Sequence, residues 1–169
     1  MDKNQLRKWA KEERSKLDME ALSEKLAKKL QRTDEYKNAK NIMIFYPLKD
    51  EVNLLSLLDD KTKVFYLPKI DGENLLCCRY ENGDPLCKSC FNTHEPVTAP
   101  ETDFTPDLII VPALAVDKNN YRLGYGKGFY DKFLVKAKAK KIVCIPKKFV
   151  VETIYPNDFD IPVDKIITA

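Results

Sequence analysis

The uninterrupted apolar run in DLIIVP, residues 107–112, is the feature that most constrains the fold of this chain. A strand without alternating polar residues must be covered on both faces, as the inner strands of parallel sheets are. Other strand-like segments precede and follow it, and segments with helical spacing separate several of them. This alternation predicts an α/β fold with a mainly parallel sheet. The expected strands are residues 41–46, 64–68, 75–80, 107–112, 141–146 and 164–168.

Helices are expected before, between and after these strands. The first thirty residues have apolar positions three or four residues apart, which predicts one broken helix or two consecutive helices, with Asp18 capping the second. Residues 33–40 favour a short helix, Asn53 can cap a helix through LLSLLDD, and FYDKFLVKAKAK favours a helix after residue 128. Residues 84–106 contain four prolines and little periodicity, and they are the longest segment expected to be irregular.

Composition and charge restrict the class of protein. A chain of 169 residues, 44% apolar and 33% charged, is long enough for one domain with its own core, here residues 1–169. No apolar run approaches the ~20 residues that span a bilayer, and the charged start of the chain is unlike a secretory signal. The net charge of +3 is spread along the chain, which does not indicate nucleic-acid binding. We expect a cytoplasmic protein, a monomer, with no membrane or nucleic-acid partner.

The cysteines and the single histidine do not indicate a metal centre. Cys87 and Cys90 form a CxxC pair, and Cys77 with Cys78 could complete four thiolates for zinc. However, adjacent cysteines in a strand point to opposite faces, and CKSC follows a turn-rich loop rather than opening a helix. We expect reduced cytosolic thiols instead, and a surface position for His94 in the loop NTHEP.

A glycine-rich turn precedes the helix expected after residue 128. The chain has only five glycines, and Gly124, Gly126 and Gly128 all fall in LGYGKGFYD, residues 123–131. Alternate glycines allow positive φ and let a ligand approach the backbone N–H groups, which together with a helix N-terminus favour an anion such as phosphate. Neither GxxxxGK[ST] nor GxGxxG fits the turn, so it is not a standard phosphate-binding motif.

Two charged residues in this region have alternative interpretations. Lys127 and Asp131 are four residues apart on the side of the helix opposite its apolar stripe, so they could form a simple ion pair. A lysine at a helix N-terminus opposes the helix dipole, however, which favours a bound anion with Asp131 holding an accompanying magnesium ion. The apolar stripe consists of Phe129, Tyr130, Phe133, Leu134 and Ala137.

Beyond these physical arguments, VPALAVDKNNYRLGYGKGFYDKFL, residues 111–134, resembles the signature of the 5-formyltetrahydrofolate cyclo-ligases, also called 5,10-methenyltetrahydrofolate synthetases. The resemblance covers nearly the whole chain. It implies ATP- and Mg²⁺-dependent conversion of 5-formyltetrahydrofolate to 5,10-methenyltetrahydrofolate, with release of ADP and phosphate. It also implies a single three-layer α/β/α domain similar to the sugar-phosphate isomerase and CoA-transferase fold. The other matching segments are KNQLR, DEVN, LPK, RYENGDPL, Glu95-Pro96 and FDIPVDKIIT.

The resemblance also implies roles for individual residues. Lys127 and Arg122 are expected to be catalytic, and Asp131 and Asp160 to bind magnesium. The expected substrate contacts are Tyr46, Glu51, Tyr125, Gly126, Lys127, Gly128 and Phe129. The expected ATP contacts are Lys3, Arg7, Arg122, Leu123, Gly124, Tyr125, Gly126, Lys127, Gly128, Phe129 and Tyr130.

The sequence departs from the family pattern at two places, and other functions remain open. Asn92 and Thr93 stand where the family favours FGI, and Pro146 stands where an aromatic residue often follows the last inner strand. On residue type alone, Tyr46 could be packing and Glu51 a surface acid. The alternative functions are a phosphosugar isomerase or CoA-transferase relative, which would need no ATP, and a non-enzymatic nucleotide- or RNA-binding module.

Overall fold

The computed structural model describes residues 1–89, 93–101 and 104–169, and its centre is a six-stranded sheet. The first five strands in spatial order run parallel to their neighbours, and β3 pairs antiparallel with β2 at one edge. The predicted α/β class and the mainly parallel sheet are therefore confirmed. The order is β11 (Lys165–Thr168), β9 (Lys140–Ile145), β6 (Leu108–Ile110), β1 (Asn41–Met43), β2 (Val64–Asp71) and β3 (Asn74–Arg79).

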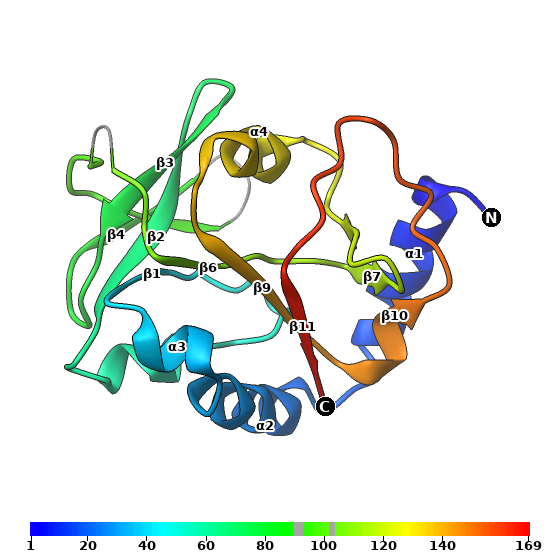
Figure 1. The fold of residues 1–169 in the computed structure, drawn as a ribbon, viewed down its shortest axis with the longest axis horizontal. Helices are drawn as coiled ribbons and strands as arrows, with labels where there is room; N and C mark the ends of the chain where they lie inside the picture. Colours follow the sequence, from blue (N-terminus) through cyan, green and yellow to red (C-terminus); the bar gives the residue numbers. More distant parts are fainter. Residues whose placement is uncertain (90–92, 102–103) are drawn as a thin grey trace.

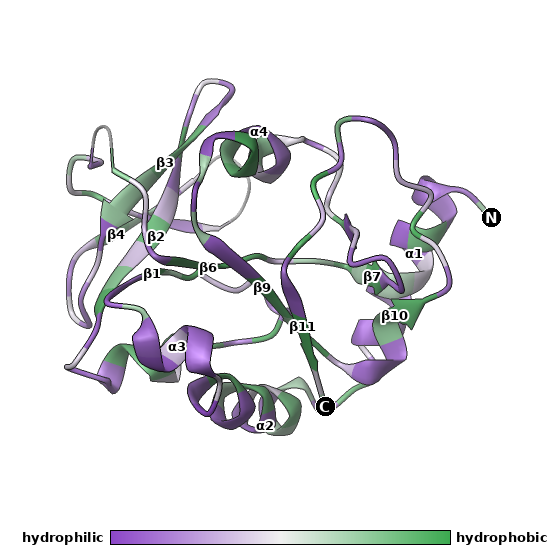
Figure 2. Cartoon of the chain, viewed as in Figure 1, coloured by the Kyte–Doolittle hydropathy of each residue, from purple (hydrophilic) through white to green (hydrophobic). Residues whose placement is uncertain are grey.

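Helices cover both faces of this sheet (Figure 1): α2 (Met19–Gln31) and α3 (Asp34–Asn38) lie on one side and α4 (Phe129–Lys136) on the other. Successive residues of a strand point to opposite faces, so Ile42 belongs to the core beneath α2, and Met43 to the core beneath α4. Strand β6 is buried on both faces, as its continuous apolar sequence predicts, and it is among the most apolar segments in Figure 2. The molecule is a three-layer α/β/α structure.

Side-chain caps begin the three N-terminal helices. In α1 (Lys3–Arg14), the Asp2 carboxylate accepts from the N–H of Gln5, and the Gln5 side chain accepts from the N–H of Asp2. Asp18 caps α2 as predicted by accepting from the N–H of Ala21. Each bond satisfies an N–H that has no partner inside its helix. Of the two possibilities left open for the first thirty residues, the structure has two consecutive helices.

Several predicted elements differ in length or type. Strand β1 ends at Met43 rather than at residue 46, and α4 ends at Lys136, where Ala137 turns to an extended conformation. The helix predicted after Asn53 is only a short 3₁₀ helix, η1 (Leu55–Asp59), whose N-cap residue is Leu54, while Asn53 accepts from the N–H of Leu55. The segment expected to be irregular contains a hairpin of β4 (Leu86–Lys88) and β5 (His94–Pro96), so His94 begins a strand rather than lying in a loop.

The glycine turn does not directly follow the central strand, because a second, smaller sheet intervenes. This sheet has the order β10 (Val150–Val151), β7 (Ala115–Asp117) and β8 (Arg122–Leu123). Asp117 is 1% exposed, and its carboxylate accepts from the N–H groups of Asn119, Tyr121 and Ile154. That buried carboxylate joins the β7–β8 turn, from which β8 starts, to the segment after β10, and the two-residue β8 ends at Leu123. The glycine turn begins at that point.

Helix α1 lies beside the small sheet and packs against the 3₁₀ turn η2 (Lys147–Phe149). The Trp9 and Phe149 rings meet edge to face with centroids 5.6 Å apart. Phe149 is fully buried, and the Arg14 guanidinium lies 5.5 Å from the centre of its ring. These contacts attach α1 to the rest of the core.

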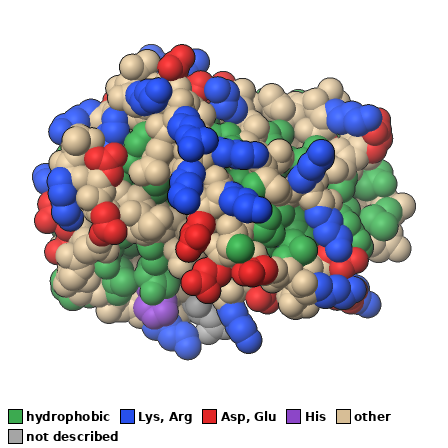
Figure 3. Space-filling view, turned by 90° about the horizontal axis from the view of Figure 1, so that it is seen from below, with side chains coloured by type: hydrophobic (Ala, Val, Ile, Leu, Met, Phe, Trp, Pro, Cys, Tyr) green, Lys and Arg blue, Asp and Glu red, His purple; other side chains and the backbone are tan. Residues whose placement is uncertain are grey.

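The surface carries charges of both signs. Acidic and basic side chains share the face shown in Figure 3, with apolar side chains exposed between them. Among the described residues, no helix combines the length and apolarity needed to cross a bilayer. The described cysteines Cys77, Cys78, Cys87 and Cys144 are free thiols, whereas the other half of the CxxC pair, Cys90, lies outside the described residues.

Two phenylalanines provide a matched test of this packing. Phe149→Ala should lower the free energy of unfolding by about 3–5 kcal/mol, because it leaves a cavity between α1 and the small sheet. Phe159→Ala should change it by less than about 0.5 kcal/mol, because Phe159 is 82% exposed. Urea denaturation of both variants and the parent measures the difference. Equal losses in the two variants would contradict this account of the core.

Candidate functional site

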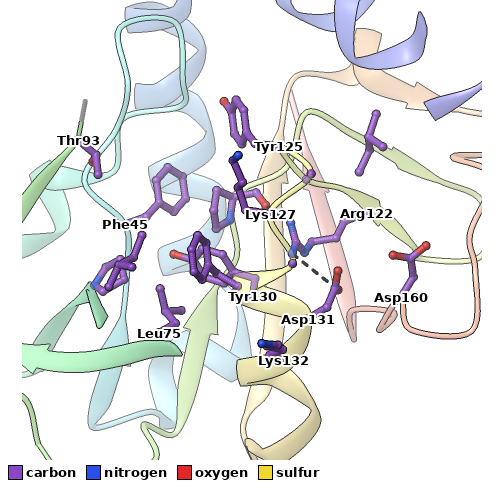
Figure 4. Close-up of a pocket in the computed structure, with 18 of the residues that line it drawn as sticks. Phe45, Leu75, Thr93, Arg122, Tyr125, Lys127, Tyr130, Asp131, Lys132 and Asp160 are labelled. Atoms are coloured by element: carbon purple, nitrogen blue, oxygen red, sulfur yellow. Dashed lines mark hydrogen bonds and ion pairs between the residues drawn. The ribbon is translucent and has the colours of Figure 1, made fainter. Parts of the chain in front are cut away.

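A cavity of about 680 Å³ lies between α1, the glycine turn and the β2–β3 edge of the central sheet. Figure 4 shows Phe45 and Leu75 on one side of it, Asp160 on the other, and Arg122, Lys127 and Asp131 between them. Segments distant in sequence therefore meet around one space. All the residues predicted for the site line it: Lys3, Arg7, Tyr46, Glu51, Arg122, Leu123, Gly124, Tyr125, Gly126, Lys127, Gly128, Phe129, Tyr130, Asp131 and Asp160.

The three glycines of the turn have different physical roles. Gly126 and Gly128 have φ values of 101° and 75°, which side chains rarely adopt, as the sequence predicts. Gly128 is also the residue from which α4 begins. Gly124 does not have positive φ, so the prediction that all three glycines provide it is wrong there. A Cβ at position 124 would lie 2.9 Å from Nη1 of Arg122, so this glycine allows the close approach of a guanidinium.

Arg122 is buried directly beneath the turn, with 6% exposure. Its Nη1 donates to the carbonyl of Pro112 at 2.9 Å, and its Nη2 lies 3.7 Å from Oδ1 of Asp131. The guanidinium also lies 5.4 Å from the centre of the Tyr130 ring. Burial lowers the pKa of Arg122, and the negative charges of Asp131 and Asp160 act in the opposite direction.

This geometry corrects the ion pair considered between Lys127 and Asp131. The ion-pair partner of the Asp131 carboxylate is Arg122, and Figure 4 shows the Lys127 side chain directed away from Asp131. Lys127 is exposed at the cavity, and its ammonium forms no hydrogen bond or ion pair with the described residues. Its charge is therefore available to a ligand.

The two cations predicted from α1 are both attached to the wall of the cavity. The Lys3 ammonium lies 2.6 Å from Oδ2 of Asp160. Arg7 donates from Nε to the carbonyl of Gly124 at 2.9 Å and from Nη1 to Asn4. These bonds hold the first turns of α1 against the glycine turn and the 152–164 loop. The nearby cations Lys3, Arg7, Arg122 and Lys127 give the middle of the cavity a positive character.

A polar cluster lies beside this region, in which the buried Arg14 and Glu51 meet the exposed Tyr125. Arg14 is 4% exposed, and it donates to the Tyr125 hydroxyl at 3.3 Å and to the carbonyl of Ala113. Glu51 is 7% exposed and accepts from the N–H of Leu48 at 2.8 Å, so it is not a surface acid. Burial raises the pKa of Glu51, while the Leu48 N–H, the Arg14 charge and a hydrogen bond with Tyr125 act in the opposite direction.

Sequence reasoning missed Arg14 and much of the apolar wall. The signal for Arg14 was present, because it continues the line of Leu6 and Ala10 at intervals of four residues on the buried face of α1. A cation on that line must find buried acceptors. The apolar lining has no comparable local signal, because its residues come from strands, a loop and helix α4 that are separate in the sequence: Phe45, Pro68, Ile70, Leu75 and Val135.

Of the residues that depart from the family pattern, one lines the cavity and another does not. Thr93 lines it and donates from its hydroxyl to the carbonyl of Tyr46 at 3.3 Å, while the Tyr46 ring lies 4.7 Å from His94. Asn92 lies outside the described residues. Pro146 is buried and is not among the residues that line the cavity, so the departure there does not alter its surface.

Comparison with known proteins decides the family. The model of the 5-formyltetrahydrofolate cyclo-ligase family matches residues 1–169. This chain belongs to that family. The resemblance inferred from residues 111–134 is thereby confirmed.

Individual relatives agree with this assignment. A cyclo-ligase of Mycoplasma pneumoniae is 28% identical, with 99% of this chain and 98% of the relative covered. A cyclo-ligase of Mus musculus is 29% identical over 122 residues, a match that spans 64% of this chain and 60% of the mouse protein. The solved structure of Aquifex aeolicus 5,10-methenyltetrahydrofolate synthetase has a TM-score of 0.87 and 34% identity, covering 99% of this chain and 90% of that one. The cyclo-ligase fold is therefore shared over essentially the whole chain.

The buried carboxyl of Glu51 predicts a pH dependence of stability. Since its pKa is raised in the folded state, the folded protein binds more protons than the unfolded one between the two pKa values. The free energy of unfolding contributed by this group therefore falls as pH rises, starting near pH ~4.3, the ordinary value for Glu. Glu51→Gln keeps an acceptor for Leu48 but cannot ionise. Its stability relative to the parent should increase with pH until the raised pKa is passed.

Urea denaturation of parent and variant over this pH range measures the effect. Glu152→Gln is the control, because Glu152 is an exposed acid paired with Lys118 outside the cavity. Its stability should follow that of the parent. Identical pH profiles for Glu51→Gln and the parent would contradict the unfavourable burial of Glu51.

Proposed function

We propose that this protein converts 5-formyltetrahydrofolate to 5,10-methenyltetrahydrofolate with cleavage of ATP to ADP and phosphate. One observation carries the proposal: a single cavity combines a cationic, glycine-lined middle with an apolar wall, and it contains every site residue that the family pattern implies. Cations and backbone N–H groups suit a triphosphate. An apolar wall with a few polar groups suits a heterocycle such as the pteridine of folate.

The apolar wall is the proposed folate side of the cavity. Phe45, Ile70 and Leu75 provide flat and aliphatic contacts, and Tyr46 and Glu51 provide polar groups at their edge. Glu51 accepts hydrogen bonds when ionised, and its burial strengthens each bond to a donor on the ligand. We therefore assign Tyr46 and Glu51 to substrate orientation, as the family resemblance implies. Tyr125 to Phe129 would lie where the folate and the nucleotide meet.

The glycine turn is the proposed phosphate site. Lys127 is exposed at the cavity with an unengaged ammonium, so it can bind the transferring phosphoryl group without breaking an existing contact. Arg122 is already bonded to Pro112 and Asp131, so it provides positive charge from beneath the turn and fixes its shape. Lys3 and Arg7 extend the cationic surface along α1. Together these residues oppose the charge of the triphosphate and stabilise the charge that develops in transfer.

The chemistry requires activation of a poor leaving group. The formyl oxygen attacks the γ-phosphorus, and the bond to the β,γ-bridging oxygen breaks to release ADP. N10 then attacks the formyl carbon and loses its proton, and the C–O bond breaks so that the oxygen leaves as part of phosphate, which can take up that proton. No protein nucleophile is needed, and the chain's task is to bring the formyl oxygen and the γ-phosphate together while excluding water.

The carboxylates of Asp131 and Asp160 fit a magnesium ion that accompanies the nucleotide. Both line the cavity, and Oδ1 of Asp131 accepts from the N–H of Ile161, next to Asp160. Within the described ranges no group of three or more His, Cys, Asp or Glu residues could hold a metal unaided. Mg²⁺ commonly uses one or two carboxylates together with phosphate oxygens and water. We propose that Asp131 and Asp160 hold such an ion, which would neutralise part of the phosphate charge.

The proposed assembly is a monomer in the cytoplasm. One chain provides every residue assigned to the cavity, so no second copy is needed to complete it. The four described cysteines are free thiols, as is usual in a reducing compartment.

The activity itself is the first test of this proposal. Protein, ATP, magnesium and 5-formyltetrahydrofolate should together give the absorbance of the methenyl product and one ADP for each product formed. Omission of either ATP or the folate should abolish both signals. Release of ADP at the same rate without the folate, or no methenyl product, would overturn the proposal.

Lys127→Ala tests the assignment of the glycine turn. A charge-assisted hydrogen bond to phosphate contributes ~1.5–3 kcal/mol. Its loss should therefore lower kcat/KM roughly ten- to a hundredfold. Lys118→Ala is the control, because Lys118 is exposed and paired with Glu152 away from the cavity. Unchanged kinetics in the Lys127 variant would remove this residue from the phosphate site.

A further inference from the structure

Phe159 is the most exposed large apolar side chain among the described residues. Its exposure is 82%, and it lines the cavity next to Asp160. A single exposed apolar residue needs no explanation on a convex surface. An aromatic ring at the edge of a ligand cavity is different, because a planar ligand can cover it.

The backbone that presents Phe159 is firmly held. The N–H of Phe159 donates to Oδ1 of Asn157 at 2.9 Å, and the N–H of Asp160 donates to the carbonyl of Asn157. The N–H of Asn157 in turn donates to Oδ2 of Asp160, the oxygen that pairs with Lys3. The turn is therefore closed on itself and attached to α1. The exposure of the ring does not come from a loosely bonded loop.

The position of Phe159 in the cavity limits what could cover it. Phe45 and Leu75 lie on the folate side, and Asp160, the neighbour of Phe159, lies on the opposite side with the cations between (Figure 4). If the triphosphate occupies the cationic middle, as proposed above, its nucleoside must extend toward one end. The apolar wall is assigned to the pteridine. The end of the cavity near Phe159 is then the part left for the base of the nucleotide.

We propose that Phe159 is the platform on which the purine base of the nucleotide stacks. The inference rests on the proposed function, because it takes the phosphate position from it. Stacking on an aromatic ring depends on the π-face that every base has, so it discriminates weakly between bases. The contact is therefore open to either purine, and ATP and GTP should both use it.

Phe159→Ala provides the test, with calorimetric titration of the protein by ATP–magnesium, GTP–magnesium and tripolyphosphate–magnesium. The variant should bind both nucleotides about five- to a hundredfold more weakly, the range for loss of one base–aromatic stack. Tripolyphosphate has no base, so its affinity should be unchanged. Phe159→Trp should restore nucleotide binding, because it restores the aromatic face.

Tyr155→Ala is the matched control, because Tyr155 is an exposed aromatic residue of the same loop that does not line the cavity. It should bind ATP as the parent does. Equal affinities of Phe159→Ala and parent for ATP would overturn the inference, and so would an equal loss for ATP and tripolyphosphate. If the parent forms the methenyl product while Phe159→Ala binds ATP normally, only this inference fails. If the parent binds no ATP, the proposed function fails with it.

Discussion

The buried guanidinium of Arg122 is the interaction on which the cavity depends. It joins the end of the β6 segment, through the carbonyl of Pro112, to the first turn of α4, through Asp131. A buried charge that loses a partner is strongly destabilising, so these two segments must keep their positions. Gly124 completes the arrangement, because any Cβ there would meet the guanidinium. The shape of the glycine turn is thus set from beneath as well as by its own dihedral angles.

Polarity divides the cavity in a way that matches its proposed ligands. The cations come from α1, β8 and the glycine turn, whereas the apolar wall comes largely from β2, β3 and Phe45. Among the described residues, four carboxylates line the cavity, and two of them, Asp131 and Asp160, each form an ion pair with a cation. Glu51 differs from these two acids. Its burial opposes ionisation and raises its pKa, and the Arg14 charge is only one of several interactions that act in the opposite direction. The environment of Glu51 therefore differs from that of Asp131 and Asp160, although all three line the same cavity.

Prediction from the sequence succeeded where an element is determined by neighbouring residues or by a repeating pattern of apolar residues. The apolar run at β6 identified a central parallel strand, and Asp18 identified the start of α2. It failed where partners are distant in the chain, as with Arg122 and Asp131, or where elements have only two or three residues, as in the small sheet. Such short strands show no measurable periodicity, and pairing across the cavity depends on tertiary packing. The family resemblance predicted residues that line one cavity, but the structure was needed to show which of them touch.

The attachment of α1 has a consequence for the dynamics of the protein. Its N-terminal half is held to the cavity by the Lys3–Asp160 pair and by the bond from Arg7 to Gly124. A nucleotide that contacts these cations binds only while α1 is docked. By linkage, such a ligand raises the free energy of detaching the helix by RT ln(1 + [L]/Kd), about 2.7 kcal/mol at a hundredfold excess over Kd. Amide hydrogen exchange in α1 would then report nucleotide occupancy. Undocking of the helix would accompany release of the nucleotide.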